Sequence, residues 1–250
     1  MRFRIAVCFV AGLLLAGCTT SPTNDKVNPK QAAEANAELG LQYMLSGQYE
    51  VAMEKLKHAL EFDDDNVNAN HYLAELYNRV GRFDEADKYY RRAVHLADND
   101  AALNNNYGVF LCSRKRYDDA EEQFLEALDD PVYRGRLDTL ENLGICLLEK
   151  PDLKKADGYL RKVLAQDARR PKSLLGMARL SFQQANYLST RAYLQRYLEI
   201  ERHTPETLWL GIRTERILGN KDALASYGML LRNNFPNAEE TRLYLQSMKP

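Results

Sequence analysis

The chain has 250 residues, with 34 lysines and arginines against 35 aspartates and glutamates, and a formal net charge of −1. No block of basic residues stands out, so neither nucleic acid nor an anionic lipid surface is expected as the main partner. HExxH, GxSxG and P-loop patterns are missing from the sequence, and the histidines do not cluster at metal-ligand spacing. We therefore expect no enzyme activity, no metal and no cofactor.

Residues 1–17 are predicted to be an export signal. Arg2 and Arg4 give it a basic start, and residues 5–15 form an apolar run too short to anchor stably across a bilayer. The run ends in Leu15-Ala16-Gly17-Cys18, which resembles the bacterial lipoprotein signal. This resemblance implies cleavage before Cys18 and lipidation of its thiol. The alternative is an ordinary secretory signal with an incidental cysteine.

Residues 18–32 are predicted to be the lipidated cysteine and a flexible tether, because they are polar, contain proline and lack apolar periodicity. Thr19 follows Cys18, where an aspartate would indicate retention in the inner membrane. The resemblance thus implies an anchor in the outer membrane, on its periplasmic face. Removal of residues 1–17 takes away two arginines and no acid, which leaves 32 basic and 35 acidic residues and a net charge of −3.

From residue 33 onward, small and large apolar residues recur with a period of 34 residues. In the first unit, Leu39 and Tyr43 share one face of a predicted helix, and Gly40 beside them permits close approach. Gly47 separates this helix from a second one, which has an apolar stripe at i, i+4 and i+7. The stripe is Ala52, Leu56 and Ala59. Neither helix can bury its stripe alone, so stacked neighbours are expected to complete the core.

This pattern resembles the tetratricopeptide repeat, TPR. The resemblance implies an all-α fold, a right-handed superhelix of six TPRs followed by a C-terminal capping helix. Two extra residues shift the register after the third repeat, and the sixth begins near Thr204, a good N-cap followed by Pro205. The superhelix is predicted over 33–237, with repeats at 33–66, 67–100, 101–134, 137–170, 171–203 and 204–237, and the capping helix at 238–250.

In the TPR family, five positions of each repeat face the inner groove: the second, fifth, ninth, twelfth and thirteenth. In the first repeat the groove positions are mostly apolar, and in the second and third they become polar, which is typical of a partner-binding surface. The alternative is that the tether or the chain's own start covers the apolar strip. The candidate groove residues are Ala37, Leu41, Met44, Leu45, His71, Glu75, Asn78, Arg79, Asn105 and Val109.

Cys112 and Cys146 are the two cysteines expected in the periplasmic part of the mature chain, and they are 34 residues apart. They fall on the first helices of the third and fourth repeats, which stack side by side in a TPR array. An oxidising periplasm would allow a disulfide between them. The alternative is a pair of buried free thiols that act as small apolar residues.

A lipoprotein signal, a short tether and six TPRs together resemble the TPR outer-membrane lipoproteins of type IV pilus biogenesis, the pilotins. The resemblance implies that the protein is a non-enzymatic scaffold that binds subunits of the pilus secretin, brings them to the outer membrane and promotes their multimerisation. We expect a monomer.

Two other functions fit parts of the sequence. A lipid-anchored TPR adaptor for β-barrel insertion or for peptidoglycan synthesis complexes would need the same groove and anchor. A peptidoglycan enzyme would need a catalytic acid set apart in a cleft, and the carboxylates here lie instead in helix-surface contexts such as Asp84-Glu85.

Overall fold

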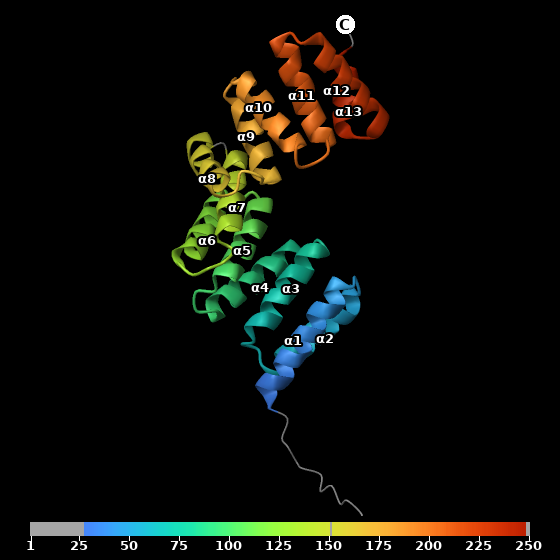
Figure 1. Cartoon of the computed structure of the whole chain (residues 1–250). Coiled ribbons are helices and arrows are strands. Elements are labelled where there is room, and N and C mark those ends of the chain that lie inside the picture. The colour runs from blue at the N-terminus through green and yellow to red at the C-terminus, as the bar shows by residue number, and fades with distance from the viewer. Residues whose placement is uncertain (1–27, 151, 249–250) are drawn as a thin grey trace, which may run out of the picture.

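The computed structural model describes residues 28–150 and 152–248, so the export signal, Cys18 and most of the tether lie outside the described residues. Within these residues the chain forms thirteen α-helices and no strand, which confirms the predicted all-helical fold. The helices follow one another along a superhelix, with α1 and α13 at opposite ends (Figure 1). None of the described helices combines the length and the apolar character needed to span a membrane.

Twelve of the helices form six hairpins, and the last one follows them. The first helices of the hairpins are α1 (Pro29–Leu45), α3 (Val67–Arg79), α5 (Ala101–Ser113), α7 (Arg136–Glu149), α9 (Pro171–Gln183) and α11 (Pro205–Leu218). The second helices are α2 (Tyr49–Phe62), α4 (Phe83–Leu96), α6 (Tyr117–Asp129), α8 (Leu153–Gln166), α10 (Tyr187–Leu198) and α12 (Lys221–Asn234). The capping helix α13 (Glu239–Gln246) packs on α11 and α12.

The turn inside each of the first two hairpins requires a left-handed residue. Gly47 and Gly81 both have φ +78°, a conformation that glycine adopts without a steric penalty. The backbone N–H of the next residue then bonds back to the first helix, as Gln48 does to the carbonyl of Tyr43 at 2.9 Å. In the third hairpin Lys115 takes this place with φ 62°, so the turn is retained without glycine.

Close contact between a small residue and a large one holds the two helices of a hairpin together. A Cβ atom added to Gly40 would lie 2.5 Å from the Leu56 side chain, and one added to Gly108 would lie 2.8 Å from the ring of Phe124. Both large side chains are fully buried. The second helices add an alanine that is also fully buried in each of the first four hairpins: Ala52, Ala86, Ala120 and Ala156.

Helix α1 begins at Pro29 and includes the last four residues of the predicted tether, so the prediction of a flexible segment through residue 32 is wrong at its C-terminal end. Asn28 is the N-cap, and its side chain accepts a hydrogen bond from the backbone N–H of Lys30 at 3.1 Å. Pro29 then occupies the first helical position, where its fixed φ and missing N–H favour a helix start. At the other end, α13 is shorter than the predicted capping helix and covers Glu239–Gln246.

The first repeat differs from the others because, among the described residues, no hairpin lies before α1. Leu39, predicted to face the core, is 37% exposed, whereas Leu73, Leu143 and Met177 at the same repeat position are fully buried. In the later repeats the preceding hairpin covers this position. The missing cover leaves part of the α1 packing face open to solvent.

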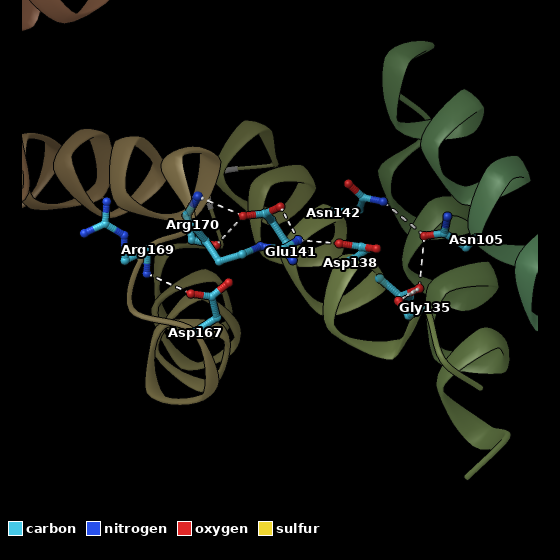
Figure 2. A network of polar contacts seen from close by, with 10 residues as sticks. Asn105, Gly135, Asp138, Glu141, Asn142, Asp167, Arg169 and Arg170 are labelled. Atoms are coloured by element: carbon cyan, nitrogen blue, oxygen red, sulfur yellow. Dashed lines mark hydrogen bonds and ion pairs between the residues drawn. The ribbon is translucent and has the colours of Figure 1, made fainter. Parts of the chain in front are cut away.

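Buried ion pairs connect neighbouring hairpins in the second half of the superhelix. Glu141 of α7 is buried and accepts hydrogen bonds from Arg170 at 2.8 Å and from the hydroxyl of Ser173 at 2.7 Å. Figure 2 shows Arg170 placed between Glu141 and Asp138, which it also contacts. The hydrogen bond that Arg170 donates to Glu141 is the main cause of the raised pKa of Arg170. Because Arg170, at the start of α9, must reach Glu141 on α7, this ion pair fixes how α9 stacks on α7.

Replacing Gly108 with alanine should destabilise the fold, because the new methyl group would clash with the ring of Phe124. We expect a loss of about 1–3 kcal/mol in the free energy of unfolding. Gly158→Ala is the matched control, since nothing lies within 4 Å of a Cβ at that helical position, and alanine there should stabilise α8 by about 1 kcal/mol. Urea unfolding of both variants measures the difference. Equal stability of the two variants would contradict close packing at Gly108.

Candidate functional site

A cleft of about 380 Å³ opens on the first helices of the second to fifth repeats. Residues of α3, α5, α7 and α9 line it, and one aromatic ring of α4 contributes to the wall. Because the first helices stack side by side, side chains distant in sequence meet along this one surface. The lining residues are Glu75, Asn78, Arg79, Tyr90, Asn105, Asn106, Val109, Phe110, Asn142 and Lys172.

Hydrogen bonds to Asn105 of α5 connect the cleft wall to the next repeat. Its side-chain oxygen accepts a hydrogen bond from the Thr139 hydroxyl and another from the Asn142 amide, each at 3.1 Å. Figure 2 shows the amide groups of Asn105 and Asn142 directed toward each other from neighbouring helices. These bonds cross from α5 to α7, so they fix the spacing of the two helices that form the cleft wall.

A second polar contact crosses from α5 to α3. The side-chain nitrogen of Asn106 lies 3.2 Å from Nε2 of His71, and this ring nitrogen lies 3.4 Å from the carboxylate of Glu75. The hydrogen bond from His71 lowers the pKa of Glu75, with a smaller contribution from the charge of Arg79, while burial acts in the opposite direction. Glu75 is therefore held as a carboxylate at neutral pH.

Two cations of the cleft have no carboxylate within ion-pair distance among residues 28–150 and 152–248. These are Arg79 at the end of α3 and Lys172 at the start of α9, both solvent-exposed. Either cation could therefore form an ion pair with a binding partner without first losing an ion pair within the protein. The charge of the cleft is mixed, because Glu75 lies on the same wall as Arg79.

The cleft also has an apolar part. The rings of Tyr90 and Phe110 pack with their centroids 5.1 Å apart, and both are buried. Burial raises the pKa of Tyr90, so the phenol stays neutral. Val109 is 44% exposed in front of them, which is a large exposure for a valine. Val109 is therefore available for apolar contact with a partner without a conformational change.

This combination suits a polypeptide more than a small substrate. Carboxamide side chains both donate and accept hydrogen bonds, so they match the N–H and C=O groups of an extended chain. Within the part of the chain that the structure describes, no three His, Cys, Asp or Glu residues are arranged to hold a metal ion. The cleft provides hydrogen bonds, charge and an apolar contact from rigid helices, and these are the elements of a protein-binding surface.

Comparison with known proteins identifies the family of this chain. A family model described as tetratricopeptide repeat matches residues 43–105. The type IV pilus assembly protein PilF of Pseudomonas aeruginosa is 32% identical over 244 residues, which cover 96% of this chain and 97% of PilF. The chain belongs to the PilF/PilW family of tetratricopeptide-repeat proteins.

Solved structures of this family have the same fold. The structure of Pseudomonas aeruginosa PilF aligns with a TM-score of 0.76 and 32% identity, over 88% of this chain and 99% of PilF. The structure of PilW, described as a widely conserved type IV pilus biogenesis factor, aligns with a TM-score of 0.80 and 30% identity, over 86% of this chain and 99% of PilW.

The structure brings together the residues of the second and third repeats that the sequence assigned to the groove of this PilF/PilW family member. Five of them line the cleft, and His71 lies behind it in contact with Glu75. The five are Glu75, Asn78, Arg79, Asn105 and Val109. Leu45 is 69% exposed at the end of α1, and Leu41 packs partly against the core. Neither leucine lines the cleft.

The assignment of Ala37 and Met44 to the exposed groove is wrong. Ala37 is fully buried, and Met44 is 1% exposed. Both belong to the stripe of α1 that packs into the hydrophobic core. The rule that assigns five positions of every repeat to the groove does not account for the packing of α1 against both α2 and α3. The apolar strip on the first repeat is therefore narrower than predicted.

Among the polar residues of the cleft, sequence reasoning missed Asn106, Asn142 and Lys172. Lys172 occupies the second position of the fifth repeat, so the same positional rule would have found it if applied beyond the third repeat. Asn106 and Asn142 lie at the sixth position, which the rule does not include. Only their contacts with His71 and Asn105 across the stacked helices identify them.

A disulfide joins Cys112 of α5 to Cys146 of α7, with Cα atoms 5.8 Å apart, a usual separation for bridged cysteines. Cys146 is buried. The bridge lies one helical turn beyond Val109 and connects the same two helices as the Asn105 hydrogen bonds. It therefore restrains the cleft wall as well as the fold.

Loss of this disulfide should lower the free energy of unfolding by about 3 kcal/mol, because the open chain regains the entropy of the closed loop. The double variant Cys112→Ser/Cys146→Ser measures this cost by urea unfolding. Thiol labelling of the freshly isolated, denatured protein should detect neither cysteine. Labelling of both cysteines in that sample would contradict the bridge.

Proposed function

We propose that the protein is a lipid-anchored scaffold for type IV pilus biogenesis, which binds subunits of the pilus secretin on the inner face of its TPR superhelix. The proposal rests chiefly on the relationship to PilF and PilW, which extends over nearly the whole chain. The cleft of the second to fifth repeats supports it, because this surface has the composition of a protein-binding site. No chemical step is required of a scaffold.

The proposed lipid anchor would explain how the protein promotes assembly of the secretin. Cys18, the proposed lipidation site, lies outside the described residues, and the superhelix begins at Asn28 and Pro29. Ten residues can span at most about 35 Å, so the superhelix would stay close to the periplasmic face of the outer membrane. Subunits bound there share one plane, and their raised effective concentration favours ring formation.

The position of the binding surface can be tested by placing a carboxylate on it. Val109→Glu in the cleft should weaken partner binding about tenfold or more, because an apolar contact would have to desolvate a charge. Leu125→Glu is the matched control, since Leu125 is 41% exposed on α6 and Val109 is 44% exposed on α5. Melting temperature, the level of secretin multimers and the number of surface pili are measured for both variants.

The first repeat can be tested in the same way. Leu45→Glu has its control in Leu188→Glu, because these leucines are 69% and 66% exposed. We expect both proteins to melt normally and only Leu45→Glu to reduce multimerisation. If Val109→Glu and Leu45→Glu both fold and support full multimerisation, the inner face is not the binding surface. Crosslinking of intact cells then shows which protein is bound instead, including a component of β-barrel insertion or peptidoglycan synthesis.

Removal of the thiol in Cys18→Ala should abolish lipidation and leave the repeats folded, because the first helix begins eleven residues later, at Pro29. Membrane fractionation should find the variant released from the outer membrane, and secretin multimers should be reduced or mislocalised. Co-sedimentation of the variant with outer membranes, together with normal multimers, would contradict the role of the anchor.

A further inference from the structure

A second group of side chains meets near the C-terminal end of the superhelix, and none of them lines the cleft. Phe182 of α9 and Tyr187 of α10 pack edge to face, with ring centroids 5.4 Å apart. The guanidinium carbon of Arg213, on α11, lies 4.1 Å from the centroid of Phe182 and 6.0 Å from that of Trp209. We call Phe182, Tyr187, Trp209 and Arg213 the aromatic–arginine cluster.

The cluster is built on rigid elements. Phe182 packs against a buried group that includes Ala178 and Leu194, and Trp209 packs against another that includes Leu208 and Ile212. The rings of Phe182, Tyr187 and Trp209 are nevertheless only partly buried. Large rings held in place with one face accessible bind a partner at a low cost in conformational entropy.

Arg213 has no carboxylate partner among residues 28–150 and 152–248, although nearby arginines do. Arg179 of α9 contacts Glu149 and Glu206, and Arg191 forms a two-pronged pair with Glu215. Arg213 is itself solvent-exposed, and the rings of Phe182 and Trp209 lie beside its guanidinium. The loss of solvation that results lowers the pKa of Arg213. A partly desolvated cation without a counter-charge attracts an anion more strongly than a fully solvated one.

The position of Arg213 over the Phe182 ring also limits which anion fits. A guanidinium that lies over a ring uses its face for that contact and leaves the N–H groups of its edge, which lie in its plane, to donate hydrogen bonds. A carboxylate accepts two such bonds in parallel, in the plane of the guanidinium. The partly buried rings of Trp209 and Phe182 lie beside the guanidinium, where an aromatic side chain of the same partner could pack.

We propose that the aromatic–arginine cluster is a binding site for a peptide carboxylate that has an aromatic residue next to it. The carboxylate can come from an aspartate or glutamate side chain or from the C-terminus of a chain. Arg213 would pair with it, and Trp209, Phe182 and Tyr187 would pack against the adjacent ring. The site is separate from the cleft and does not depend on the identity of the partner bound there.

The test uses the single tryptophan of the chain, Trp209, as its reporter. The protein used is the mature chain with Cys18→Ala, which carries no lipid and therefore needs no detergent, and which is otherwise unchanged. The indole N–H resonance is followed by NMR during titration with acetyl-Gly-Phe-Asp-Phe-Gly-amide. The same peptide with asparagine or with lysine in place of aspartate is titrated in parallel. A fourth peptide, acetyl-Gly-Gly-Gly-Phe-Phe with a free terminal carboxylate, tests whether the site binds the C-terminus of a chain.

We expect the aspartate peptide, the free-terminus peptide or both to shift the indole resonance with saturation, and the asparagine and lysine peptides to bind about tenfold more weakly or not at all. Which of the two carboxylate peptides binds identifies the source. Added salt should weaken the binding. The proposal is overturned if neither carboxylate peptide binds, or if the lysine or asparagine peptide binds as well as they do.

Variants separate the cluster from the cleft. Arg213→Gln replaces the guanidinium with a shorter, neutral amide, so it should reduce carboxylate binding about tenfold. Arg213→Lys keeps the charge without the planar edge and should restore binding only in part. Val109→Glu should leave the titration unchanged, since Val109 belongs to the cleft. Wild-type affinity in Arg213→Gln with normal melting would contradict the assignment.

Discussion

The contact of a small residue with a large side chain inside each helix hairpin is the constraint on which the rest of this structure depends. Gly40 against Leu56 and Gly108 against Phe124 bring the two helices so close that one further methyl group would not fit. This distance sets the shape of the hairpin, and the shape sets how the next one can stack. Because each hairpin buries its remaining apolar surface only on its neighbours, the superhelix and its inner face both follow from this packing.

The cleft depends on how firmly the stacked hairpins are connected. The hydrogen bonds of Asn105 join α5 to α7, and the disulfide between Cys112 and Cys146 joins the same two helices farther along. The contact of Asn106 with His71 extends the connection to α3. A partner that lies across these repeats would therefore meet side chains already held at their spacing. Less conformational entropy is then lost on binding, which increases affinity without additional contacts.

Two surfaces of different chemistry lie on this superhelix. The cleft combines amide groups with one acid and two cations that lack ion-pair partners among the described residues, while the aromatic–arginine cluster combines rings with one cation. They lie on successive first helices, α3 to α9 for the cleft and α9 to α11 for Phe182, Trp209 and Arg213. A solenoid makes such a series possible, because every repeat presents its first helix in a similar way but with different side chains.

The sequence by itself determined the helices, their pairing and most of the polar cleft, because a period of 34 residues places the same position of every repeat in the same local environment. It could not decide the exposure of individual residues in the first repeat. Leu39 is exposed because no hairpin precedes α1 within the part of the chain that the structure describes, and Met44 is buried because α1 packs on both α2 and α3. Nor could it show that Arg213 lies over Phe182, which is 31 residues away on another helix. Periodicity describes what repeats have in common, whereas these features depend on the ends of the stack and on side chains that only tertiary packing brings together.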